Sequence, residues 1–459
     1  MHYEKFADGS VKCIEEEIPF ELPEGWEWTR LGVLFSHNTG KALNSKKQMG
    51  TFYTYITTSN VYWNKFELDG IKQMPYTEAE LEKCTVRTGD LLVCEGGDIG
   101  RAAIWTRDEE IRIQNHIHRL RPYVNLCVKF YYYVFLLYKQ TERISGKGIG
   151  IQGLSSNQLH ALYFPLPPLL EQEEIADKVD NYFYYIDFIE SEKTDLQSTI
   201  QLAKSKILDL AIRGKLVPQD PNDEPASVLL ERIREEKEKL IKQGKIKRDK
   251  NESVIFRGED NSYYEKIGDK VRCIDDEVPF ELPEGWEFAR LSNICNINPR
   301  NDIDDELLTS FVPMSFIGNG FSNTFSFDNR KWKDIKNGFT HFAENDVGFA
   351  KITPCFENRK SVIFRNLCNG YGAGTTELYI LHPYCNTISP NYLLYLIKSE
   401  RFINSGKETF SGAVGQQRVG KEFVLKHICP IPPISEQIRI ENKVSLLLKT
   451  LDNIEESLN

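Results

Sequence analysis

Two histidines and a few proline- or glycine-flanked segments are the places where residue type and spacing suggest chemistry. His116 and His118 stand two residues apart in a strand-like stretch beside Asn115. Alternate positions of a strand face the same side, so the two imidazoles could share a metal ion or form a hydrogen-bonded pair on the surface. We favour the surface pair and expect no metal on this chain.

Three motifs that would indicate catalysis are missing from the sequence. A methyltransferase acting on a base amine would carry Asn/Asp-Pro-Pro-Tyr/Phe, and the segment SPNY at 389–392 is not such a motif. An ATP-binding loop reads G-x4-G-K-S/T, whereas Gly406-Lys407-Glu408 lacks both the upstream glycine and the hydroxyl residue. A Pro-Asp…Glu-x-Lys nuclease core is absent because no Pro-Asp dipeptide occurs. These absences disfavour a free-standing enzyme.

Composition indicates a chain with real cores and no membrane span. Its 459 residues suggest two to four domains, and 41% hydrophobic residues are enough to build cores. The longest apolar runs fall far short of the roughly 20 residues that a bilayer requires, and residues 1–10 carry no signal core. Ten scattered cysteines without a Cys-x-x-Cys pair suit reduced thiols in a cytoplasm. The net charge of −10 argues against indiscriminate polyanion binding but permits local basic patches.

A long helix over residues 175–210 is the element that must position the rest. After the prolines at 165–168, neither proline nor glycine occurs until Gly214. Apolar residues recur at a 3.5-residue period, which predicts a coiled coil about 50 Å long. With Lys193 as the charged residue in register, the seam comprises Ile175, Val179, Tyr182, Ile186, Ile189, Leu196, Ile200, Ala203, Ile207 and Leu210. Such a helix suits a spacer between two bodies.

The sequence is a tandem duplication. Cys13–Leu31 reads CIEEEIPFELPEGWEWTRL, and Cys273–Leu291 reads CIDDEVPFELPEGWEFARL 260 residues later. The proline block PLPPLLEQ at 165–172 returns as PIPPISEQ at 430–437. A second heptad seam follows it, formed by Ile440, Val444, Leu447, Leu451, Ile454 and Leu458. Each copy is therefore a globular module followed by a long helix, and not a solenoid repeat of about 20–50 residues.

The two modules share a frame and differ in detail. Strand signals punctuated by glycine dominate 31–122, a buried helix is predicted at 130–143, and a glycine-rich loop follows at 146–153. The second module has its helix at 392–402 and its loop at 411–418. Between these landmarks the modules diverge, as binding modules for two different targets would.

A second, highly charged helix is predicted at 226–242, between the two modules. It runs into the basic tail Lys245–Lys250. The tail is either a solvated helix end, which we favour, or a contact to a nucleic-acid backbone.

The paired modules, each closing with P-x-P-P-x-x-E-Q and a long helix, resemble the specificity (S) subunit of type I restriction–modification enzymes. The segment ILDLAIRGKLVP at 207–218 carries the same resemblance, which covers essentially the whole chain. It implies an α+β fold with pseudo-two-fold symmetry, in which two target recognition domains of mixed β-structure and helices are separated by long antiparallel coiled-coil helices. It also implies that each domain reads half of a bipartite DNA sequence and that the chain has no catalytic residue.

The resemblance sets further expectations for domains and partners. The expected segments are recognition domain 1 at 1–168, a helical spacer and docking region at 169–250, recognition domain 2 at 251–433 and a distal spacer helix at 434–459. The implied partners are double-stranded DNA, methyltransferase (M) subunits and, through them, restriction/translocase (R) subunits in the cytoplasm. No cofactor is expected on this chain, whereas S-adenosylmethionine, ATP and magnesium belong to the partner subunits.

Polar side chains on glycine-permitted loops are what the reading of DNA grooves requires. In the first module the candidates are Lys41, Lys46, Lys47, Arg101, Lys147 and Gln152. In the second module they are Asn298, Arg300, Asn301, Lys351, Arg359, Lys360, Gln416, Gln417 and Arg418. Lysines would mostly position the DNA backbone, and arginine, glutamine and asparagine would read bases. A solvated surface role is the alternative for each single residue, so the clusters carry more weight than their members.

Two alternatives stay open at the level of sequence. An S-like scaffold whose modules bind proteins in another defence system would share this architecture. The aromatic run Tyr182–Tyr185 either packs internally or forms a docking face for a partner.

The second seam is only about half as long as the first. We therefore expect residues 440–458 to pack against only part of 175–210, leaving the rest exposed or covered by 226–242 or by another chain.

Overall fold

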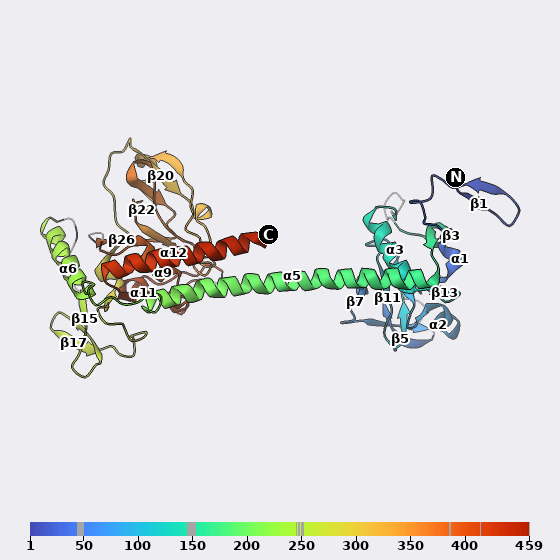
Figure 1. Cartoon of the computed structure of the whole chain (residues 1–459), viewed down its shortest axis with the longest axis horizontal. Coiled ribbons are helices and arrows are strands. Elements are labelled where there is room, and N and C mark those ends of the chain that lie inside the picture. Colours follow the sequence, from blue (N-terminus) through green and yellow to red (C-terminus); the bar gives the residue numbers. More distant parts are fainter. Residues whose placement is uncertain are drawn as a thin grey trace. The chain divides into compact units, whose positions relative to one another are not determined.

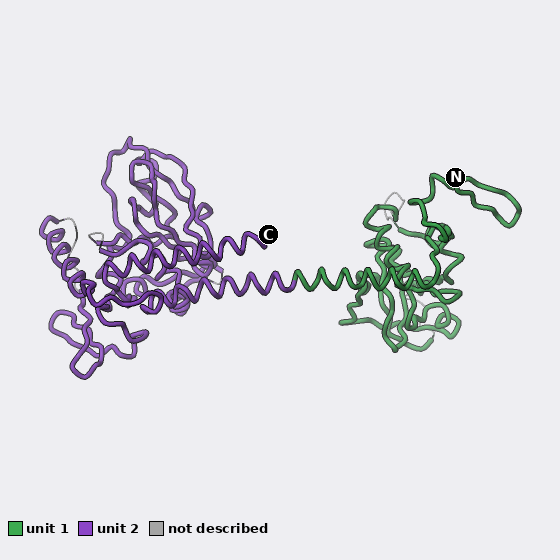
Figure 2. The backbone as a smooth tube through the Cα atoms, viewed as in Figure 1, with its two compact units in different colours: residues 1–190 green, residues 191–459 purple. Residues whose placement is uncertain are grey.

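The structure is a computed structural model of the 459-residue chain. It describes all residues except 44–49, 145–152, 245, 247, 249–251, 385–386, 414 and 459. The chain divides into two compact units, Met1–Glu190 and Ser191–Asn459, drawn in green and purple in Figure 2. Each unit combines small β-sheets with covering helices (Figure 1), which confirms the expected α+β class.

Helix α5 (Leu169–Ile212) is 44 residues long and includes the boundary between the units (Figure 1). It follows the proline block directly, and it stops at Gly214, whose φ of +64° a side-chain-bearing residue rarely adopts. Beyond the end, Lys215 N–H donates to Leu210 O (2.9 Å) and Gly214 N–H donates to Ala211 O (3.3 Å). This pair of bonds is the Schellman motif that satisfies the last carbonyls of a helix.

Unit 1 contains two four-stranded sheets of order β11-β10-β13-β4 and β8-β5-β12-β9. Most neighbours are antiparallel, but β5 and β12 run parallel, with Arg112 opposite Tyr55. The strands are β4 (Phe35–Thr39), β5 (Thr51–Ile56), β8 (Lys72–Tyr76), β9 (Thr85–Val86), β10 (Leu91–Cys94), β11 (Ala102–Ile104), β12 (Ile111–Ile113) and β13 (Ile117–Pro122). The central strand β10 is completely buried, as its run of apolar residues predicts.

Helix α3 (Val128–Gln140) fills the core beside the first sheet of unit 1. Tyr131 and Phe135 on this helix are fully buried, so the buried helix predicted at 130–143 is confirmed. On its other face, Lys129 and Tyr133 both bond to Asp180 of α5. The shorter helices of the unit are α1 (Leu31–Leu34), α2 (Glu78–Cys84) and α4 (Ser156–Ala161).

Unit 2 repeats this plan with sheets of order β19-β26-β23-β24 and β21-β20-β25-β22. Its parallel pair is β20 and β25, the counterparts of β5 and β12. The strands are β19 (Cys295–Ile297), β20 (Leu308–Val312), β21 (Asp328–Lys331), β22 (Thr340–Ala343), β23 (Val347–Ala350), β24 (Ser361–Ile363), β25 (Tyr371–Gly374) and β26 (Leu378–Pro383). The equivalent strand pairs β10–β13 and β23–β26 also share their register. The first residue of β10, Leu91, lies opposite Leu120, and the first residue of β23, Val347, lies opposite Leu381.

Unit 2 contains the charged helix predicted between the modules and the distal spacer helix. Helix α6 (Ala226–Lys242) has the predicted bounds 226–242 and buries Leu229 and Ile233 in the core. Of the basic tail that follows, Arg248 pairs with Glu238 at 2.6 Å, and most of the tail lies outside the described residues. The remaining helices are α7 (Leu291–Ile294), α8 (Trp332–Ile335), α9 (Pro390–Lys398), α10 (Glu400–Lys407), α11 (Lys421–Lys426) and α12 (Ile434–Ser457).

Each module is closed by a short sheet between its two ends. In unit 1, β3 (Glu27–Arg30) pairs with β14 (Tyr163–Leu166). In unit 2, β18 (Glu287–Arg290) pairs with β27 (Ile428–Ile431). The repeated tryptophan segment and the repeated proline block thus meet within each unit, which explains why both are common to the two copies.

A β-hairpin precedes the closing sheet in each unit. It comprises β1 (Tyr3–Lys5) and β2 (Val11–Cys13) in unit 1, and β16 (Tyr263–Ile267) and β17 (Lys270–Cys273) in unit 2, where β15 (Ser253–Arg257) adds a third strand. An arginine of the closing sheet holds the hairpin in both. Arg30 Nε donates to Glu4 at 2.6 Å, and Arg290 Nε donates to Glu265 at 2.9 Å.

The last part of α5 packs antiparallel to α12 inside unit 2. Gln201 and Lys204 bond to Glu455 near the end of α12, whereas Gln219, just past α5, bonds to Glu436 near its start. The expected antiparallel spacer is therefore present in this unit. Its buried seam includes Ile200, Leu208, Ile440 and Val444, all at most 3% exposed, with Ile207, Leu210, Leu447, Leu451 and Leu458 partly buried.

The middle of the predicted seam on α5, from Tyr182 to Leu196, is exposed. Ile175 and Val179 are half-buried, but Tyr182 is 69%, Ile186 50% and Leu196 41% exposed. Ile454 on α12 is also 41% exposed. The prediction that residues 440–458 match only part of the first seam is confirmed. Helix α6 does not cover the remainder, since residues 181–192 are exposed without exception.

Candidate nucleic-acid interface

In each unit a buried aspartate stands directly before a central strand of the first sheet: Asp90 precedes β10, and Asp346 precedes β23. Asp90 accepts two hydrogen bonds of 2.7 Å from Arg121, one to each carboxylate oxygen. At the equivalent positions of unit 2, Asp346 accepts a 2.6 Å bond from His382 Nδ1. The hydrogen bond to Asp90 raises the pKa of Arg121. Burial raises the pKa of Asp346, and the hydrogen bond to Asp346 raises the pKa of His382.

At the other end of this strand, the residue that follows the glycine-rich segment donates a backbone hydrogen bond in both units. Leu154 N–H donates to Glu95 O at 2.8 Å in unit 1, and Val419 N–H donates to Lys351 O at 2.9 Å in unit 2. We call these places the loop junctions. The backbone bond is the same in both units, but the residue that accepts it is the acidic Glu95 in unit 1 and the basic Lys351 in unit 2.

The loop junction of unit 2 gathers several of the predicted site residues. Arg418 lies in a β-bridge with Ile352 and forms bonds of 2.8 and 2.9 Å to Glu377. Lys351 Nζ lies 5.5 Å from the centre of the Tyr379 ring. The hydrogen bond from Arg418 lowers the pKa of Glu377 and holds it as a carboxylate. Arg418 keeps 42% of its side chain exposed, so its remaining edge is open to a ligand.

Two glutamines of the same loop differ in their roles. Gln416 is exposed, and its backbone carbonyl accepts a bond from Arg418 Nη1 at 3.0 Å. Gln417 is half-buried, and its carbonyl accepts a bond from Thr353 N–H at 2.9 Å. The structure therefore brings Lys351, Gln416, Gln417 and Arg418 together, as a cluster from two distant segments of sequence.

The predicted group at 298–301 supports the backbone more than it faces outward. Asn298, with a φ of +55°, exchanges two bonds with the backbone of Ile380, donating at 2.8 Å and accepting at 2.9 Å. Asn301 Nδ2 donates to Phe342 O at 2.9 Å. Asn298 and Arg300 are both exposed, and Arg300 Nη1 lies 3.2 Å from His341 Nε2. Of the three, Arg300 is the best placed to meet a ligand.

Arg359 and Lys360 are held within the fold of unit 2. Arg359 donates to Lys398 O at 2.9 Å and pairs with Glu400. Lys360 Nζ donates to the carbonyls of Met314 and Ile317, both at 3.0 Å. Their cationic groups are thus used to fix loops, a role that nothing in the local sequence signalled.

In unit 1, the two described candidates are also engaged internally. Lys41 Nζ lies 2.7 Å from Glu80 and 2.6 Å from Pro75 O, with 14% of its side chain exposed. Arg101 donates to Thr58 O at 2.6 Å and lies over the Tyr62 ring. The other four candidates, Lys46, Lys47, Lys147 and Gln152, lie outside the described residues.

The predicted histidine pair is wrong. Strand β13 begins at Ile117, so His116 lies in the preceding turn and the alternation does not reach it. His118 is fully buried, 2.8 Å from His37 Nε2 and 2.7 Å from Leu154 O, whereas the exposed His116 lies 3.4 Å from Glu95. Burial and the neighbouring His118 lower the pKa of His37 to about 4.

A metal site is not evident among the residues that the structure describes. They contain no group of three or more His, Cys, Asp or Glu side chains able to hold an ion.

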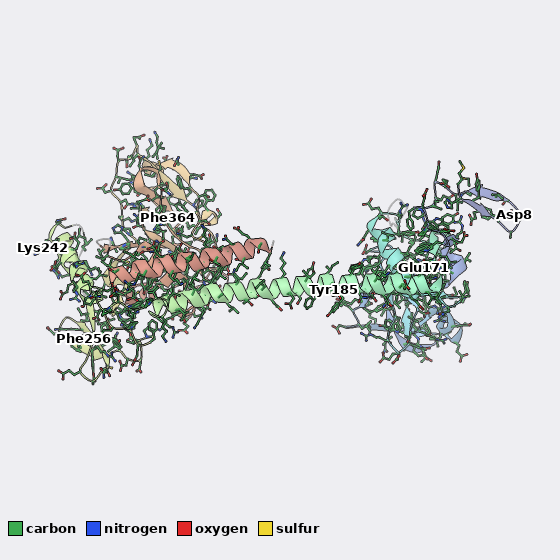
Figure 3. All side chains as sticks on the ribbon, in the orientation of Figure 1. Asp8, Glu171, Tyr185, Lys242, Phe256 and Phe364 are labelled. Carbon is green, nitrogen blue, oxygen red and sulfur yellow. The ribbon has the colours of Figure 1, made fainter. Side chains whose placement is uncertain are left out.

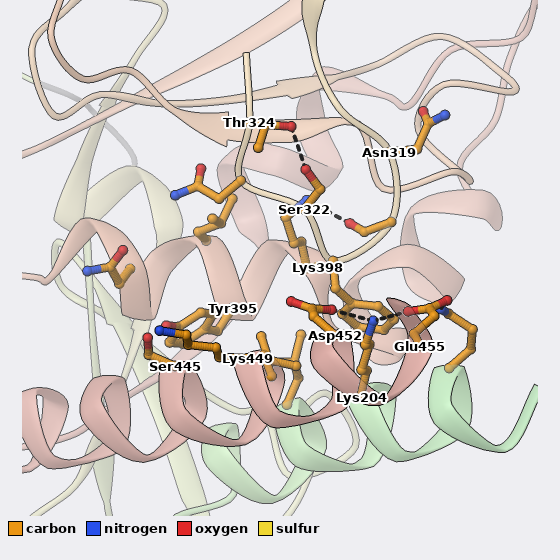
Figure 4. Close-up of a pocket in the computed structure, with 18 of the residues that line it drawn as sticks. Lys204, Asn319, Ser322, Thr324, Tyr395, Lys398, Ser445, Lys449, Asp452 and Glu455 are labelled. Carbon is orange, nitrogen blue, oxygen red and sulfur yellow. Dashed lines mark hydrogen bonds and ion pairs between the residues drawn. The ribbon is translucent and has the colours of Figure 1, made fainter. Parts of the chain in front are cut away.

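A cleft of about 900 Å³ lies in unit 2 between the spacer helices and the loop at 319–324 (Figure 4). Its charged lining is balanced, with four basic residues and four acidic ones. Lys204 sits between Asp452 and Glu455, at 2.6 and 2.5 Å. Burial lowers the pKa of Lys398 there to about 7. A phosphate backbone needs excess positive charge, so we do not assign this cleft to DNA.

Several important residues carried no signal in the sequence. Glu377, which orients Arg418, is separated from it by 41 residues. The Asp90–Arg121 and Asp346–His382 pairs likewise join neighbouring strands over more than 30 positions. Lys204, which directly follows the seam residue Ala203, was not singled out either. Pairing of this kind follows from strand register, which a single sequence does not display.

The chain is similar to a known protein family and to proteins within it. The family described as "Type I restriction modification DNA specificity domain" matches residues 23–198 and 283–459. The EcoAI specificity subunit of a type I restriction enzyme from Escherichia coli is 46% identical over 267 residues, which are 58% of this chain and 42% of that protein. The EcoEI specificity subunit from Escherichia coli is 45% identical over 265 residues, 58% of this chain and 41% of that protein. The matches thus span less than half of each relative.

A solved structure shares the fold of the chain. The HsdS subunit from Thermoanaerobacter tengcongensis aligns with a TM-score of 0.54 at 15% identity, covering 96% of this chain and 94% of that one. The family match includes most of both modules, the first part of α5 up to residue 198 and α12, and the solved structure has the same fold. On this evidence the chain belongs to the family of type I restriction–modification DNA specificity domains, with two copies of the domain in tandem.

Proposed function

We propose that the chain is the DNA-recognition subunit of a type I restriction–modification complex and that each unit reads one half of a bipartite DNA target. The loop junctions carry this proposal. In both units the residue directly after the glycine-rich segment donates the same backbone bond to the end of the central strand. A common frame with different side chains is what two readers of different half-sites require.

In this proposal the second half-site is read at the loop junction of unit 2. Arg418 and Gln416 are exposed there, and both side-chain types form paired hydrogen bonds to base edges in the major groove. Arg300 contributes a further exposed guanidinium. Lys351 supplies a backbone contact. In unit 1 the corresponding loop lies mostly outside the described residues.

The proposed chemistry resides in partner subunits. The chain would recruit M subunits and, through them, R subunits in the cytoplasm, and these would carry S-adenosylmethionine, ATP and magnesium. Among the described residues, no helix is both long and apolar enough to cross a membrane. The chain itself would contribute sequence recognition and the spacing of the two half-sites.

The test is DNA binding by the chain assembled with its M subunit. Specific binding should appear with a steep salt dependence, because each neutralised phosphate adds about 0.9 to the slope of log K against log salt. Gln416→Ala and Arg300→Ala should lower affinity for the specific target, whereas Lys443→Ala, on an exposed position of α12, should not. A complex that binds all sequences equally would overturn the proposal.

A further inference from the structure

In both units, the residue that follows the glycine-rich segment is held at both of its backbone groups. Its N–H donates to the end of the central strand, from Leu154 in unit 1 and from Val419 in unit 2. Its carbonyl accepts a second bond from a buried side chain. His118 Nε2 lies 2.7 Å from Leu154 O, and the Tyr379 hydroxyl donates to Val419 O at 3.2 Å. Because both groups are paired, the orientation of this residue is fixed.

The two side chains come from the same position of equivalent strands. His118 lies on β13 opposite Val93, the third residue of β10. Tyr379 lies on β26 opposite Phe349, the third residue of β23. Figure 3 shows how densely side chains fill each unit, and both residues belong to these interiors, His118 fully buried and Tyr379 6% exposed. Two different residue types therefore have the same role in the two units.

Both side chains are in the protonation state that this bond requires. Burial raises the pKa of Tyr379, so the hydroxyl keeps the proton that it donates. Burial lowers the pKa of His118, so the ring is neutral and carries one proton. Because a carbonyl only accepts, that proton lies on Nε2, and Nδ1 is left to accept a bond of 2.8 Å from His37 Nε2.

In unit 2 the tyrosine also lies beside the proposed base-reading arginine. Val419, whose carbonyl Tyr379 holds, directly follows Arg418 in the chain. Glu377, which binds the Arg418 guanidinium, directly precedes the strand that carries Tyr379. The arginine is thus held twice from the start of β26: Glu377 binds its guanidinium, and Tyr379 fixes the backbone of the residue that follows it.

We propose that Tyr379 is a positioning residue for DNA recognition, because its hydroxyl fixes Val419 and thereby sets the direction in which Arg418 meets DNA. Tyr379 is buried and does not itself contact DNA. Its role rests on the proposed function, in which Arg418 reads a base of one half-site. His118 has the equivalent place in unit 1, where it fixes Leu154.

The test measures discrimination between specific and non-specific duplexes by the full chain assembled with its M subunit. Tyr379→Phe removes the hydroxyl and keeps the ring beside Phe349 and Lys351. We expect the ratio of specific to non-specific affinity to fall about 3- to 10-fold, as the loss of one hydrogen bond implies. In a chain that already carries Arg418→Ala, the same substitution should lower the ratio no further, because the hydroxyl acts through the arginine.

The matched control is Tyr392→Phe in the same unit. Tyr392 is 1% exposed, and its hydroxyl donates to Pro430 O at 2.9 Å. The control therefore removes a buried bond of the same kind, from a tyrosine to a backbone carbonyl, at a place away from Arg418. Tyr392→Phe should lower the free energy of unfolding, as Tyr379→Phe does, and should leave the affinity ratio unchanged.

Failure of this proposal and failure of the proposed function give different results. If Arg418→Ala lowers the affinity ratio and Tyr379→Phe does not, the positioning role is overturned and the proposed function stands. An equal fall with and without Arg418, or an equal fall for Tyr392→Phe, would also overturn the positioning role, since a general loss of stability would then explain the effect. An unsubstituted complex that binds all sequences equally would overturn the proposed function and the positioning role together.

Discussion

Lys204 Nζ lies 2.5 Å from Glu455 Oε2, although the lysine side chain is only 5% exposed. Asp452 adds a second carboxylate at 2.6 Å (Figure 4). Burial opposes the charge on Lys204 most strongly, yet the hydrogen bonds that Lys204 donates to Asp452 and Glu455 raise its pKa. This contact joins the end of α12 to α5 and fixes how far along the spacer the two helices overlap within unit 2.

Removing the carboxylates should cost more than removing the lysine. The double substitution Asp452→Asn with Glu455→Gln leaves a buried ammonium without its counter-charges, and we expect it to lower the free energy of unfolding by about 1–3 kcal/mol, a figure reduced for the partial exposure of both carboxylates. Lys204→Met should cost less than about 1 kcal/mol. Urea unfolding followed by circular dichroism measures both, with Lys443→Met as the control. Equal losses for the two variants would contradict this account.

Isoleucine-to-alanine substitutions at two positions of α5 should distinguish the buried part of the seam from the exposed part. Ile200 is 3% exposed and Ile189 is 63% exposed. Ile200→Ala should reduce the free energy of unfolding by about 2–4 kcal/mol because it leaves a cavity. Ile189→Ala should change it by less than about 0.5 kcal/mol. Similar losses at both positions in the isolated chain would mean that the distal seam is covered by an element of the chain.

The stabilisation contributed by the His382–Asp346 contact of unit 2 should fall as pH rises, and that contributed by the Arg121–Asp90 contact of unit 1 should not. His382 bonds to the buried Asp346, and the folded-state pKa of His382 is raised above its usual 6.5. A raised pKa gives stability that is complete below pH 6.5 and is lost as pH rises through the folded value. Burial also raises the pKa of Asp346, which acts in the same direction. In unit 1 the partner of Asp90 is Arg121, which stays charged.

Hydrogen exchange at β23 and β10 between pH 6 and 8.5 would measure this difference, after correction for the intrinsic exchange rate. Protection of β23 should decline with pH, and protection of β10 should stay level. His382→Arg should make β23 behave like β10. If protection at β23 were independent of pH in the unsubstituted chain, the His382–Asp346 contact would have no stabilising charge component.

Glu377 should restrain Arg418 and limit its contact with DNA. Arg418→Ala should weaken binding of the assembled complex to its specific target by about 1–3 kcal/mol if the arginine reads a base, with a smaller effect on non-specific DNA. Glu377→Gln frees the guanidinium and should strengthen non-specific binding, most clearly at low salt. Fluorescence anisotropy with specific and non-specific duplexes would separate the two effects. Equal weakening on both duplexes would assign Arg418 to the phosphate backbone.

The duplication and the long helix could be predicted from the sequence because both follow from patterns along the chain. A 3.5-residue period gives a helix, and the proline block and Gly214 mark where α5 begins and ends. The seam predicted on α12 missed Leu448, which packs against the core of unit 2. The proposed domain limits at 168 and 433 remain predictions, although α5 and α12 begin at Leu169 and Ile434.

Individual site residues could not be predicted with the same success. Residue type alone singled out Arg359, Lys360 and Lys41, yet each cation is bound by a carboxylate or a carbonyl of its own unit. A basic residue on a loop can either fix the loop by hydrogen bonds within the protein or bind a ligand. Which role it has depends on the hydrogen-bond acceptors that the fold places near its cationic group. The glycine loop at 411–418 was recognised because glycine spacing is visible in sequence, but its docking against Lys351 was not.

The central claim is that two modules read two half-sites separated by a spacer of fixed length. Its most direct test is the DNA methylation pattern of a cell that expresses this chain with its M subunit, compared with the pattern produced by Arg418→Ala and Gln416→Ala. We predict methylation at a bipartite sequence with a constant gap, and substitutions in unit 2 that relax one half of it while the other half is kept. A continuous methylated motif, no methylated motif, or relaxation of both halves together would contradict the claim.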